Sequence, residues 1–398
     1  MIPRLKPTLG VKELSAALRV PAKDDVIRFE QNFAKLMDQG YALAFPYGRT
    51  GLLFLLKALG IEDQEIICPA YTCVVVPHAI KFSGNTPVFV DCESDGFNMD
   101  LDLVGKAISK KTGAIVATSI FGYPVNLDKL DEIREKFPKV HIIQDCAHSF
   151  AARWRDRPVQ KEGIAAVFGL NISKLLTSIF GGMITTDDYT VYNKLKQLRD
   201  NNLNPASWKK SIRRLIYLIA VYLSFTKGSY GVINRLERAG ILDQFVKYYD
   251  ETTINMPDDY LAAMTNVEAR VGMANIERYE DIINNRVAAA THYFNVLRDY
   301  PGLELPPRVS GATYSHFVGR VTNRAGWLQK GLKDGLQFGW LIEYCIPMMT
   351  PYGASPGDKF PVSARYAKTT INLPVWGGEE TARKVTTKLA AAQYNVKS

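Results

Sequence analysis

The chain has 398 residues, of which 47% are hydrophobic and 22% are charged. This is the composition of an ordinary globular protein, and the length suffices for one large domain and a smaller one. The first residues are polar and no apolar stretch follows them, so we expect no secretory signal. The formal net charge of +9 indicates affinity for anions, such as phosphorylated small molecules or acidic lipids. Nucleic acid ranks last among these partners, because the sequence has no zinc-finger, RNA-binding or basic-zipper motif.

The five cysteines are an odd number, and no two of them form a C-x-x-C pair. This pattern argues against a disulfide framework and against a zinc ribbon, so we expect no metal site. Reduced cysteines are the rule in the cytoplasm, which is the localisation that we expect.

Short apolar runs alternate with amphipathic stretches between residues 41 and 188. The runs predict strands at 66–68, 87–90, 114–117, 141–143, 165–168 and 183–186. The stretches between them predict helices at 51–59, 74–82, 101–109 and 127–137. Strands that alternate with helices pair in parallel, and continuous apolar runs indicate burial on both faces. We therefore predict an α/β fold in which helices sandwich a mostly parallel, seven-stranded type of sheet.

The composition changes after a further helix predicted at 189–202. Residues 207–225 combine four basic residues with an apolar run that is shorter than the roughly 20 residues of a membrane span. Two interpretations stay open for this segment. It is either a buried or subunit-contact helix, or an amphipathic helix that touches a membrane surface peripherally. We treat residues 205–255 as an unusual insertion.

A long helical pattern returns at 260–297, with a break near 278–281. The remaining chain predicts two strands and two helices, at 315–321, 370–373, 325–335 and 379–392. We assign residues 1–255 to a large domain, and residues 256–398 to a long helix and a small α+β domain.

The first feature with chemical meaning is a polar, glycine-containing turn at residues 47–52, which opens an apolar helix. The free amide groups at the start of a helix, together with the helix dipole, favour the binding of an anion. Thr50 adds a hydroxyl group, and Arg49 adds a fork of donors. A threonine that merely caps the helix explains the same pattern.

The second feature is Asp145, which directly follows the apolar run of a predicted strand. A carboxylate in this position lies at the carboxyl end of the strand, where open α/β sheets bind ligands. It suits a cofactor with a protonated pyridine nitrogen, because the ion pair keeps the ring an electron sink. His148 can bond to a ring oxygen or orient Asp145. A helix cap and a core histidine are the structural alternatives for the two residues.

The third feature is Lys174, which lies in an apolar loop before the pair Gly181 and Gly182. Burial lowers the pKa of a lysine, which suits a nucleophile that forms a Schiff base. Adjacent glycines let the backbone approach a ligand closely. An isolated lysine of this kind is more often at the surface. Its order after Thr50 and Asp145, however, matches the plan of fold-type-I enzymes that use pyridoxal 5′-phosphate.

Several stretches of the chain resemble the DegT–StrS family of pyridoxal-phosphate sugar aminotransferases. They are FEQNFA at 29–34, PAYTC at 69–73, PVFVD at 87–91, DCAHSF at 145–150, NISK at 171–174, GGMITT at 181–186 and MTNVEA at 264–269. The resemblance extends over residues 29–203 and 264–374. It implies the fold-type-I architecture and a transaminase activity.

The resemblance also implies roles for individual residues. Lys174 would hold pyridoxal 5′-phosphate as a Schiff base and move a proton between cofactor and substrate. Asp145 would pair with the pyridine nitrogen, and His148 would lie beside the phenolic oxygen. Thr50 and the amide of Gly51 would hold the phosphate.

The remaining residues that we assign to the cofactor are Arg49, Tyr71, Cys73, Asn171 and Ser173. Members of the family typically transfer an amino group from glutamate to a keto-sugar linked to a nucleotide. They act as homodimers whose active sites are shared between subunits. We expect the same donor, acceptor and assembly here.

The sequence departs from the family pattern at its phosphate contacts. Gly169 stands where a phosphate-binding serine is usual, and Leu261 and Ala263 stand where the neighbouring subunit often supplies an asparagine and an arginine. Each lost bond to phosphate costs about 1.5–3 kcal/mol if nothing replaces it. We expect Arg49 to be the replacement, or the basic residues 209–214 of the neighbouring subunit.

Two further departures concern the cofactor ring and the substrate. Cys73 stands where an aromatic side chain often stacks on the ring, and Tyr71 is the expected substitute. Residues 346–349 replace a segment that usually carries a histidine.

Two other functions remain open at this point. One is a sugar dehydratase that uses the same cofactor, although that branch of the family replaces the lysine with histidine. The other is a non-catalytic relative with a regulatory or structural role. The presence of both Lys174 and Asp145 favours amino transfer over either alternative.

Overall fold

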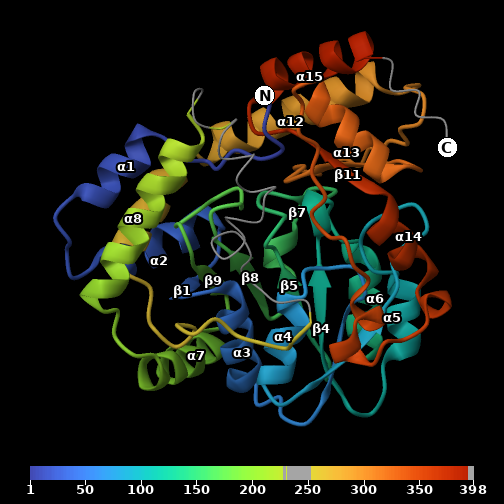
Figure 1. Ribbon diagram of the computed structural model, residues 1–398. Helices are drawn as coiled ribbons and strands as arrows, with labels where there is room; N and C mark the ends of the chain where they lie inside the picture. The colour runs from blue at the N-terminus through green and yellow to red at the C-terminus, as the bar shows by residue number, and fades with distance from the viewer. Residues whose placement is uncertain (227–229, 231–251, 393–398) are drawn as a thin grey trace.

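The structure is a computed structural model, and it describes residues 1–226, 230 and 252–392. A seven-stranded sheet with the order β1-β9-β8-β5-β4-β2-β3 forms the centre of the molecule (Figure 1). Its strands are β1 (Tyr41–Phe45), β2 (Glu65–Pro69), β3 (Thr86–Val90), β4 (Thr112–Thr118), β5 (His141–Asp145), β8 (Ala165–Gly169) and β9 (Gly182–Thr186). Strand β9 is antiparallel to both of its neighbours, and the other pairs of the sheet are parallel. The predicted, mostly parallel sheet is confirmed.

Strand β1 is the one strand of this sheet that the apolar runs did not predict. It pairs with β9 from Tyr41 opposite Thr186 to Phe45 opposite Gly182. The two strands are far apart in the sequence, so their pairing depends on the assembled sheet and not on a local pattern.

Helices cover both faces of the sheet, as expected. One face carries α3 (Gly48–Ala58), α4 (Val75–Phe82) and α7 (Tyr189–Asn202). The other carries α2 (Asp25–Leu36), α5 (Leu101–Ala107), α6 (Leu127–Lys136) and α11 (Asn266–Ile276). Strand β4 packs against the helices on both faces of the sheet. Its alternate residues Ala114 and Val116 lie in the core on one face. Ile115 and Ala117 lie in the core on the other face. A strand that is buried on both faces reads as a continuous apolar run.

Most of the C-terminal part of the chain lies at the top of the view in Figure 1, whereas α14 lies at the right, beside the large sheet. A two-stranded sheet of β10 (Phe317–Arg320) and β11 (Thr370–Leu373) accompanies the helices α12 (Tyr279–Val296), α13 (Arg324–Lys333), α14 (Pro361–Thr369) and α15 (Gly378–Ala392). The predicted break in the long helical pattern is confirmed, because α11 ends at Ile276 and α12 begins at Tyr279.

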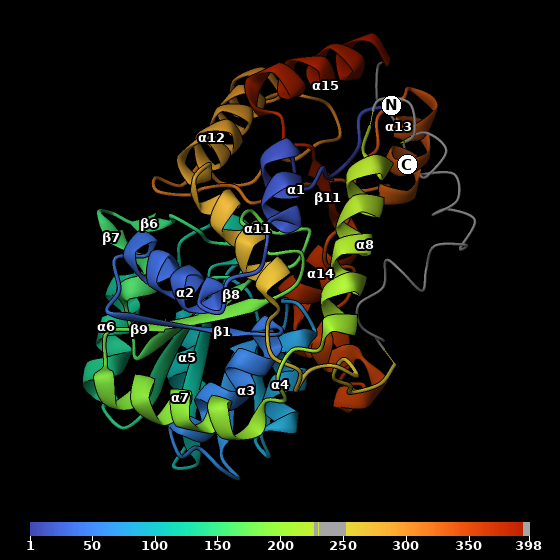
Figure 2. The same cartoon turned by 90° about the vertical axis from the view of Figure 1, so that its left-hand side faces the viewer.

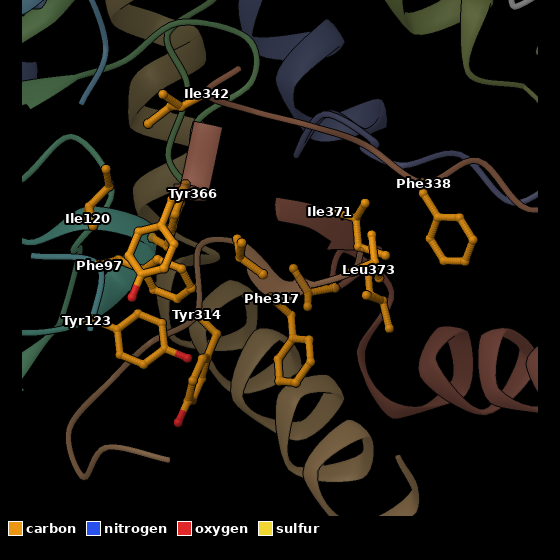
Figure 3. Packing of buried hydrophobic residues seen from close by; sticks show 14 of the residues in the cluster. Phe97, Ile120, Tyr123, Tyr314, Phe317, Phe338, Ile342, Tyr366, Ile371 and Leu373 are labelled. Carbon is orange, nitrogen blue, oxygen red and sulfur yellow. The ribbon is translucent and has the colours of Figure 1, made fainter. Parts of the chain in front are cut away.

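One aromatic core joins this C-terminal part to the large sheet. Figure 3 shows Phe97 and Tyr123, from loops beside the large sheet, packed with Tyr366 of α14 and Tyr314. The ring centroids of Phe97 and Tyr366 are 5.3 Å apart. One hydrophobic core contains residues from both parts of the chain. The division into two domains at residue 255 stays a prediction.

Two helices outside the layers cover one flank of the molecule, α1 (Val11–Leu18) and α8 (Trp208–Ser224) (Figures 1 and 2). Helix α8 is the described part of the insertion predicted at 205–255, and most of the rest of that insertion lies outside the described residues. In the part of the chain that the structure describes, no helix is both long and apolar enough to cross a membrane. The short elements are the hairpin β6 (Arg153–Trp154) and β7 (Arg157–Pro158), and the 3-10 helices η1 (Ile120–Gly122), η2 (Val159–Lys161), η3 (Ile346–Met348), η4 (Thr350–Tyr352) and η5 (Gly357–Lys359).

Candidate active site

Asp145 is the last residue of β5 and lies almost fully buried at the carboxyl edge of the sheet. Its Oδ2 accepts a hydrogen bond from the Thr118 hydroxyl at 3.1 Å, and its Oδ1 accepts one from the Ala147 N–H at 3.1 Å. Burial raises the pKa of Asp145, while these two donors and Lys174 act in the opposite direction. No cation among the described residues forms an ion pair with this carboxylate. A buried carboxylate of this kind is stabilised by a cationic ligand.

Lys174 lies in a tight turn after β8 that its neighbours hold in shape. The Lys174 N–H donates to the Asn171 carbonyl at 3.0 Å. The Asn171 Oδ1 accepts from the Ser173 N–H at 3.1 Å and from the Ser173 hydroxyl at 2.7 Å. Asn171 and Ser173, predicted to contact the cofactor, therefore bond to each other and shape the turn that presents Lys174.

The side chain of Lys174 is partly exposed and lies against Gly169. A Cβ atom on Gly169 would be 3.3 Å from the Lys174 Cε. Burial lowers the pKa of Lys174, and the nearby Cys73 and Asp145 oppose this effect. A lowered pKa increases the fraction of neutral amine, which is the nucleophilic form. The structure thus brings Cys73, Asp145 and Lys174 together.

His148 lies near the same lysine in a defined orientation. Its Nδ1 accepts the Phe121 N–H at 3.3 Å, which assigns the proton of the neutral ring to Nε2. Its ring is nearly parallel to that of Phe121, with centroids 5.9 Å apart. Burial, Lys174 and His316 all lower the pKa of His148. The ring is therefore neutral at physiological pH.

His316 is a site residue that the sequence reasoning did not identify. Its ring centroid lies 5.3 Å from that of His148, and its Nδ1 lies 3.1 Å from the Ser315 hydroxyl. Burial, Arg286 and Lys174 lower its pKa. Arg286 is itself buried and donates to the Ser315 carbonyl at 2.5 Å. His316 precedes β10, so only the packing of the C-terminal part against the large sheet brings it close to Lys174.

The start of α3 lies beside the same turn. A side chain at Gly182 would collide with the amide nitrogen of Gly48, and a Cβ atom on Gly48 would lie 3.2 Å from the Phe168 carbonyl oxygen. Glycines at both positions therefore allow the start of α3 to approach β8 and β9. The amides of residues 48–50 have no acceptor within the helix, because they form its first turn. Amides at the start of a helix favour an anion, and the start of α3 lies beside Gly169.

Two details of the predicted phosphate site need correction. The Gly51 N–H donates to the Tyr47 carbonyl at 3.1 Å inside the helix, so it is not available to a phosphate. A Cβ atom on Gly51 would also lie 2.9 Å from Ile184, so this glycine serves the packing of α3 on β9. Thr50 is fully buried, and its hydroxyl donates to the Tyr260 carbonyl at 3.1 Å.

Arg49 and Tyr71 have different surroundings. Arg49 belongs to the first turn of α3 and is buried. Tyr71 is fully buried in the aromatic core, where its hydroxyl bonds to the Thr370 Oγ1 at 3.1 Å and to the Ile342 carbonyl at 3.3 Å. The structure does not bring Tyr71 to Lys174 as a stacking ring, because its ring packs on Phe121 and its hydroxyl faces the C-terminal part.

Helix α8 holds the loop that precedes α11 against the start of α3. Arg214 donates from Nη2 to the Asp259 Oδ2 at 2.7 Å and from Nε to the Glu268 Oε1 at 2.9 Å. The Tyr47 hydroxyl donates to the other Asp259 oxygen at 2.5 Å. The basic residues of α8 stand out in the sequence, but their bonds to Asp259 and Glu268 could not be predicted from it.

Lys210 completes this arrangement one helical turn earlier. It is almost fully buried, and its Nζ donates to the carbonyls of Ala262 and Ala263 at 2.8 and 3.0 Å. Leu261, in the same loop, packs against the core beneath α3. The loop with the replacements Leu261 and Ala263 is therefore fixed in place by α8.

Comparison with known proteins agrees with this geometry. A profile of the DegT/DnrJ/EryC1/StrS aminotransferase family matches residues 20–390. GDP-perosamine synthase from Escherichia coli O157:H7 is 26% identical over 383 residues, which cover 94% of this chain and 93% of that protein.

Solved structures share the fold. DesV from S. venezuelae superposes with a TM-score of 0.77 at 21% identity, covering 97% of this chain and 95% of that one. The PLP form of a putative sugar aminotransferase from Streptococcus pneumoniae has a TM-score of 0.78 at 19% identity, covering 100% of both chains. Together with the profile match over nearly the whole sequence, these likenesses identify the chain as a member of the DegT/DnrJ/EryC1/StrS aminotransferase family, whose enzymes depend on pyridoxal 5′-phosphate.

Proposed function

We propose that this aminotransferase moves an amino group from an amino acid, expected to be L-glutamate, to a keto-sugar that is linked to a nucleotide. The observation that carries the proposal is the position of Lys174, whose pKa is lowered, beside the buried carboxylate of Asp145. The name and the 26% identity of the GDP-perosamine synthase support a sugar nucleotide as the acceptor.

The residues at the edge of the sheet fit the cofactor. Asp145 would hold the pyridine nitrogen, because a buried carboxylate without an ion-pair partner among the described residues gains from a cationic ring. The amides of residues 48–50, aided by the helix dipole, would hold the phosphate. When bound, pyridoxal 5′-phosphate supplies an electron sink for the carbon that carries the transferred amino group.

The side chains around this position have separate tasks. Lys174 would provide the amine that anchors the cofactor and, once the amino substrate has displaced it, would act as the neutral base that moves the proton at the reacting carbon. His148 presents its Nε2–H as a donor in one orientation, because the Phe121 N–H holds Nδ1. Cys73 offers a small, polarisable side chain near Lys174, where a larger ring is common in the family.

The same proposal covers the assembly and the compartment. We expect a cytoplasmic homodimer with shared active sites, in line with the family resemblance and with five free cysteines. The loop with Leu261 and Ala263 is the segment expected to approach the partner subunit, and α8 fixes its conformation. A sugar dehydratase and a non-catalytic relative are the alternatives, and the amine of Lys174 argues against both.

The test uses the purified full-length protein with added pyridoxal 5′-phosphate. The loaded enzyme is expected to absorb near the visible edge, to lose this band with L-glutamate, and to regain it with a keto-sugar nucleotide. Mass spectrometry of the sugar then distinguishes amino transfer from loss of water.

Lys174→Ala is expected to lower turnover by at least about 10³-fold, whereas the exposed control Lys106→Ala keeps the wild-type rate. A colourless protein that cannot be loaded would contradict the proposal. So would a Lys174→Ala protein in which glutamate is still converted at the wild-type rate.

A further inference from the structure

The outward sides of α1 and α8 carry an uncommon combination of side chains. The two helices pack side by side on one flank of the molecule (Figures 1 and 2). We define the α1–α8 face by their exposed residues Val11, Lys12, Leu18, Arg19, Trp208, Lys209, Ile212, Arg213 and Ile216. None of these residues belongs to the group around Asp145, His148 and Lys174 in its own subunit.

Large apolar side chains on this face are exposed to water. On α8, Trp208 is 69%, Ile212 46% and Ile216 61% exposed. Their spacing of four residues places them in one stripe along the helix. On α1, Val11 is 72% and Leu18 62% exposed. Single exposed apolar residues are normal, but several of them on two helices that pack together indicate an interaction site.

The charges on the α1–α8 face have one sign. The exposed charged residues are Lys12 and Arg19 at α1, and Lys209 and Arg213 on α8. Helix α8 contains no acidic residue, and the single acid of α1, Glu13, is fully buried. In the described ranges, none of the four cations forms an ion pair.

The inward side of α8 uses its cations differently. Lys210 is buried and Arg214 is mostly buried, and they bond to carbonyls and carboxylates of the protein, as described above. Each belongs to an adjacent pair with an outward cation, Lys209 or Arg213. The inward member of each pair stabilises the fold, and the outward member is left for an external anion.

Charge and polarity together decide what binds this face. In a two-fold symmetric contact centred on this face, four cations would meet four cations with no exposed acid on either helix. An acidic protein would satisfy the cations but offers no general reason for the apolar stripe between them. An anionic lipid surface satisfies both, because apolar side chains enter the headgroup boundary while cations reach the phosphates.

We infer that the α1–α8 face binds the surface of an anionic lipid bilayer, with α8 lying parallel to the membrane plane. Trp208 at the start of α8 suits this position, since its ring is apolar and its N–H remains in contact with water and headgroups. This contact does not depend on the catalytic proposal, because lipid binding requires no turnover.

The test is co-sedimentation of the cofactor-loaded, full-length enzyme with vesicles. Binding is expected with phosphatidylcholine vesicles that contain phosphatidylglycerol, not with phosphatidylcholine alone, and it should weaken as salt is added. The double variant Lys209→Glu/Arg213→Glu is expected to bind at least about 25-fold more weakly, since each cation near the surface contributes about 5-fold. The matched control Lys106→Glu/Lys110→Glu reverses two exposed cations elsewhere and should bind as the wild type does.

The apolar stripe is tested by Ile212→Ser/Ile216→Ser, which should lower binding even at low salt. On binding, the emission of Trp208 should shift to the blue, and Trp208→Phe should remove that shift. Wild-type enzyme that fails to sediment with phosphatidylglycerol vesicles would overturn the inference. It would also be overturned if the Lys209→Glu/Arg213→Glu protein bound normally, or if its dimer dissociated in analytical ultracentrifugation, which would make the face a subunit contact.

Discussion

Arg214 of α8 and Glu268 of α11 form an ion pair, with 2.9 Å between Nε and Oε1, in which the Glu268 side chain has no exposure to solvent. The same guanidinium bonds to Asp259 and lies 4.1 Å from the ring centroid of Phe180. Glu268 also accepts the N–H of Thr265 at 2.8 Å, which caps α11. A helix from the unusual insertion therefore supports the start of α3, through the Asp259 carboxylate that Arg214 and Tyr47 share.

The first prediction follows from this pair. Arg214→Met should lower the free energy of unfolding by about 3–5 kcal/mol, because it leaves the buried Glu268 without its ion-pair partner. The neighbouring variant Arg213→Met changes an exposed residue and should stay within about 0.5 kcal/mol of the wild type. Urea unfolding of both variants measures the difference. Equal stabilities would contradict the structural role of Arg214.

The second prediction concerns Asp145. Asp145→Asn should weaken the binding of pyridoxal 5′-phosphate by about 2–5 kcal/mol, because an amide cannot form an ion pair with the ring nitrogen. Titration with the cofactor, followed by absorbance, gives the affinity. Asp102→Asn removes a carboxylate that is exposed on α5 and is the control. If both variants bind the cofactor like the wild type, Asp145 does not hold the ring.

A third prediction uses the departure at Gly169. A Cβ atom there would lie 3.3 Å from the Lys174 Cε and 3.5 Å from the Ala147 Cβ, so a small side chain fits with a slight adjustment. Gly169→Ser should bind the cofactor about tenfold more tightly than Gly169→Ala, since the hydroxyl adds one hydrogen bond to a charged phosphate. The alanine variant controls for the added Cβ. Equal affinities of the two variants would place the phosphate away from residue 169.

The fourth prediction is a dependence of stability on pH. Because burial, Arg286 and Lys174 lower the pKa of His316 in the folded protein, the unfolded chain binds more protons below a pH of about 6.5. Stability must then fall as the pH falls. Relative to His316→Gln, the wild type should lose about 1.4 kcal/mol of unfolding free energy per pH unit in this range. Urea unfolding at several pH values gives the free energy of unfolding of both proteins. If the two free energies change with pH in parallel, His316 is protonated in the folded state.

The fold could be predicted from two kinds of element, strands that are buried on both faces and helices that have one apolar side. In β4 and β5, apolar residues follow one another because both faces need them, so the pattern is visible in a short stretch of sequence. Strand β1 lies at the edge of the sheet and pairs with β9, which is distant in the chain. Its five residues were not recognised because their burial depends on that pairing.

The candidate site divides in the same way. Asp145 was predicted from its place at the end of a strand, since parallel strands bring their carboxyl ends to one edge of the sheet. Lys174 was predicted from its place in a loop before two glycines and from its order after Thr50 and Asp145. The bond of Thr50 to Tyr260 and the position of His316 were not found, because each joins residues from separate parts of the chain. Tyr71 was assigned to the cofactor from its place in a motif, but the motif does not reveal that the Tyr71 hydroxyl bonds to Thr370 in the C-terminal part.

Local sequence patterns predicted six of the seven strands of the large sheet and most of the helices that cover it, and they marked Asp145 and Lys174 as candidates, since periodicity and strand ends are local properties. The packing of the folded chain determined that the Thr50 hydroxyl bonds to Tyr260, which histidine joins His148, and which cations of α8 face inward. Neighbouring residues such as Arg213 and Arg214 are indistinguishable by composition, and they differ only because one side of a helix meets the protein and the other meets solvent.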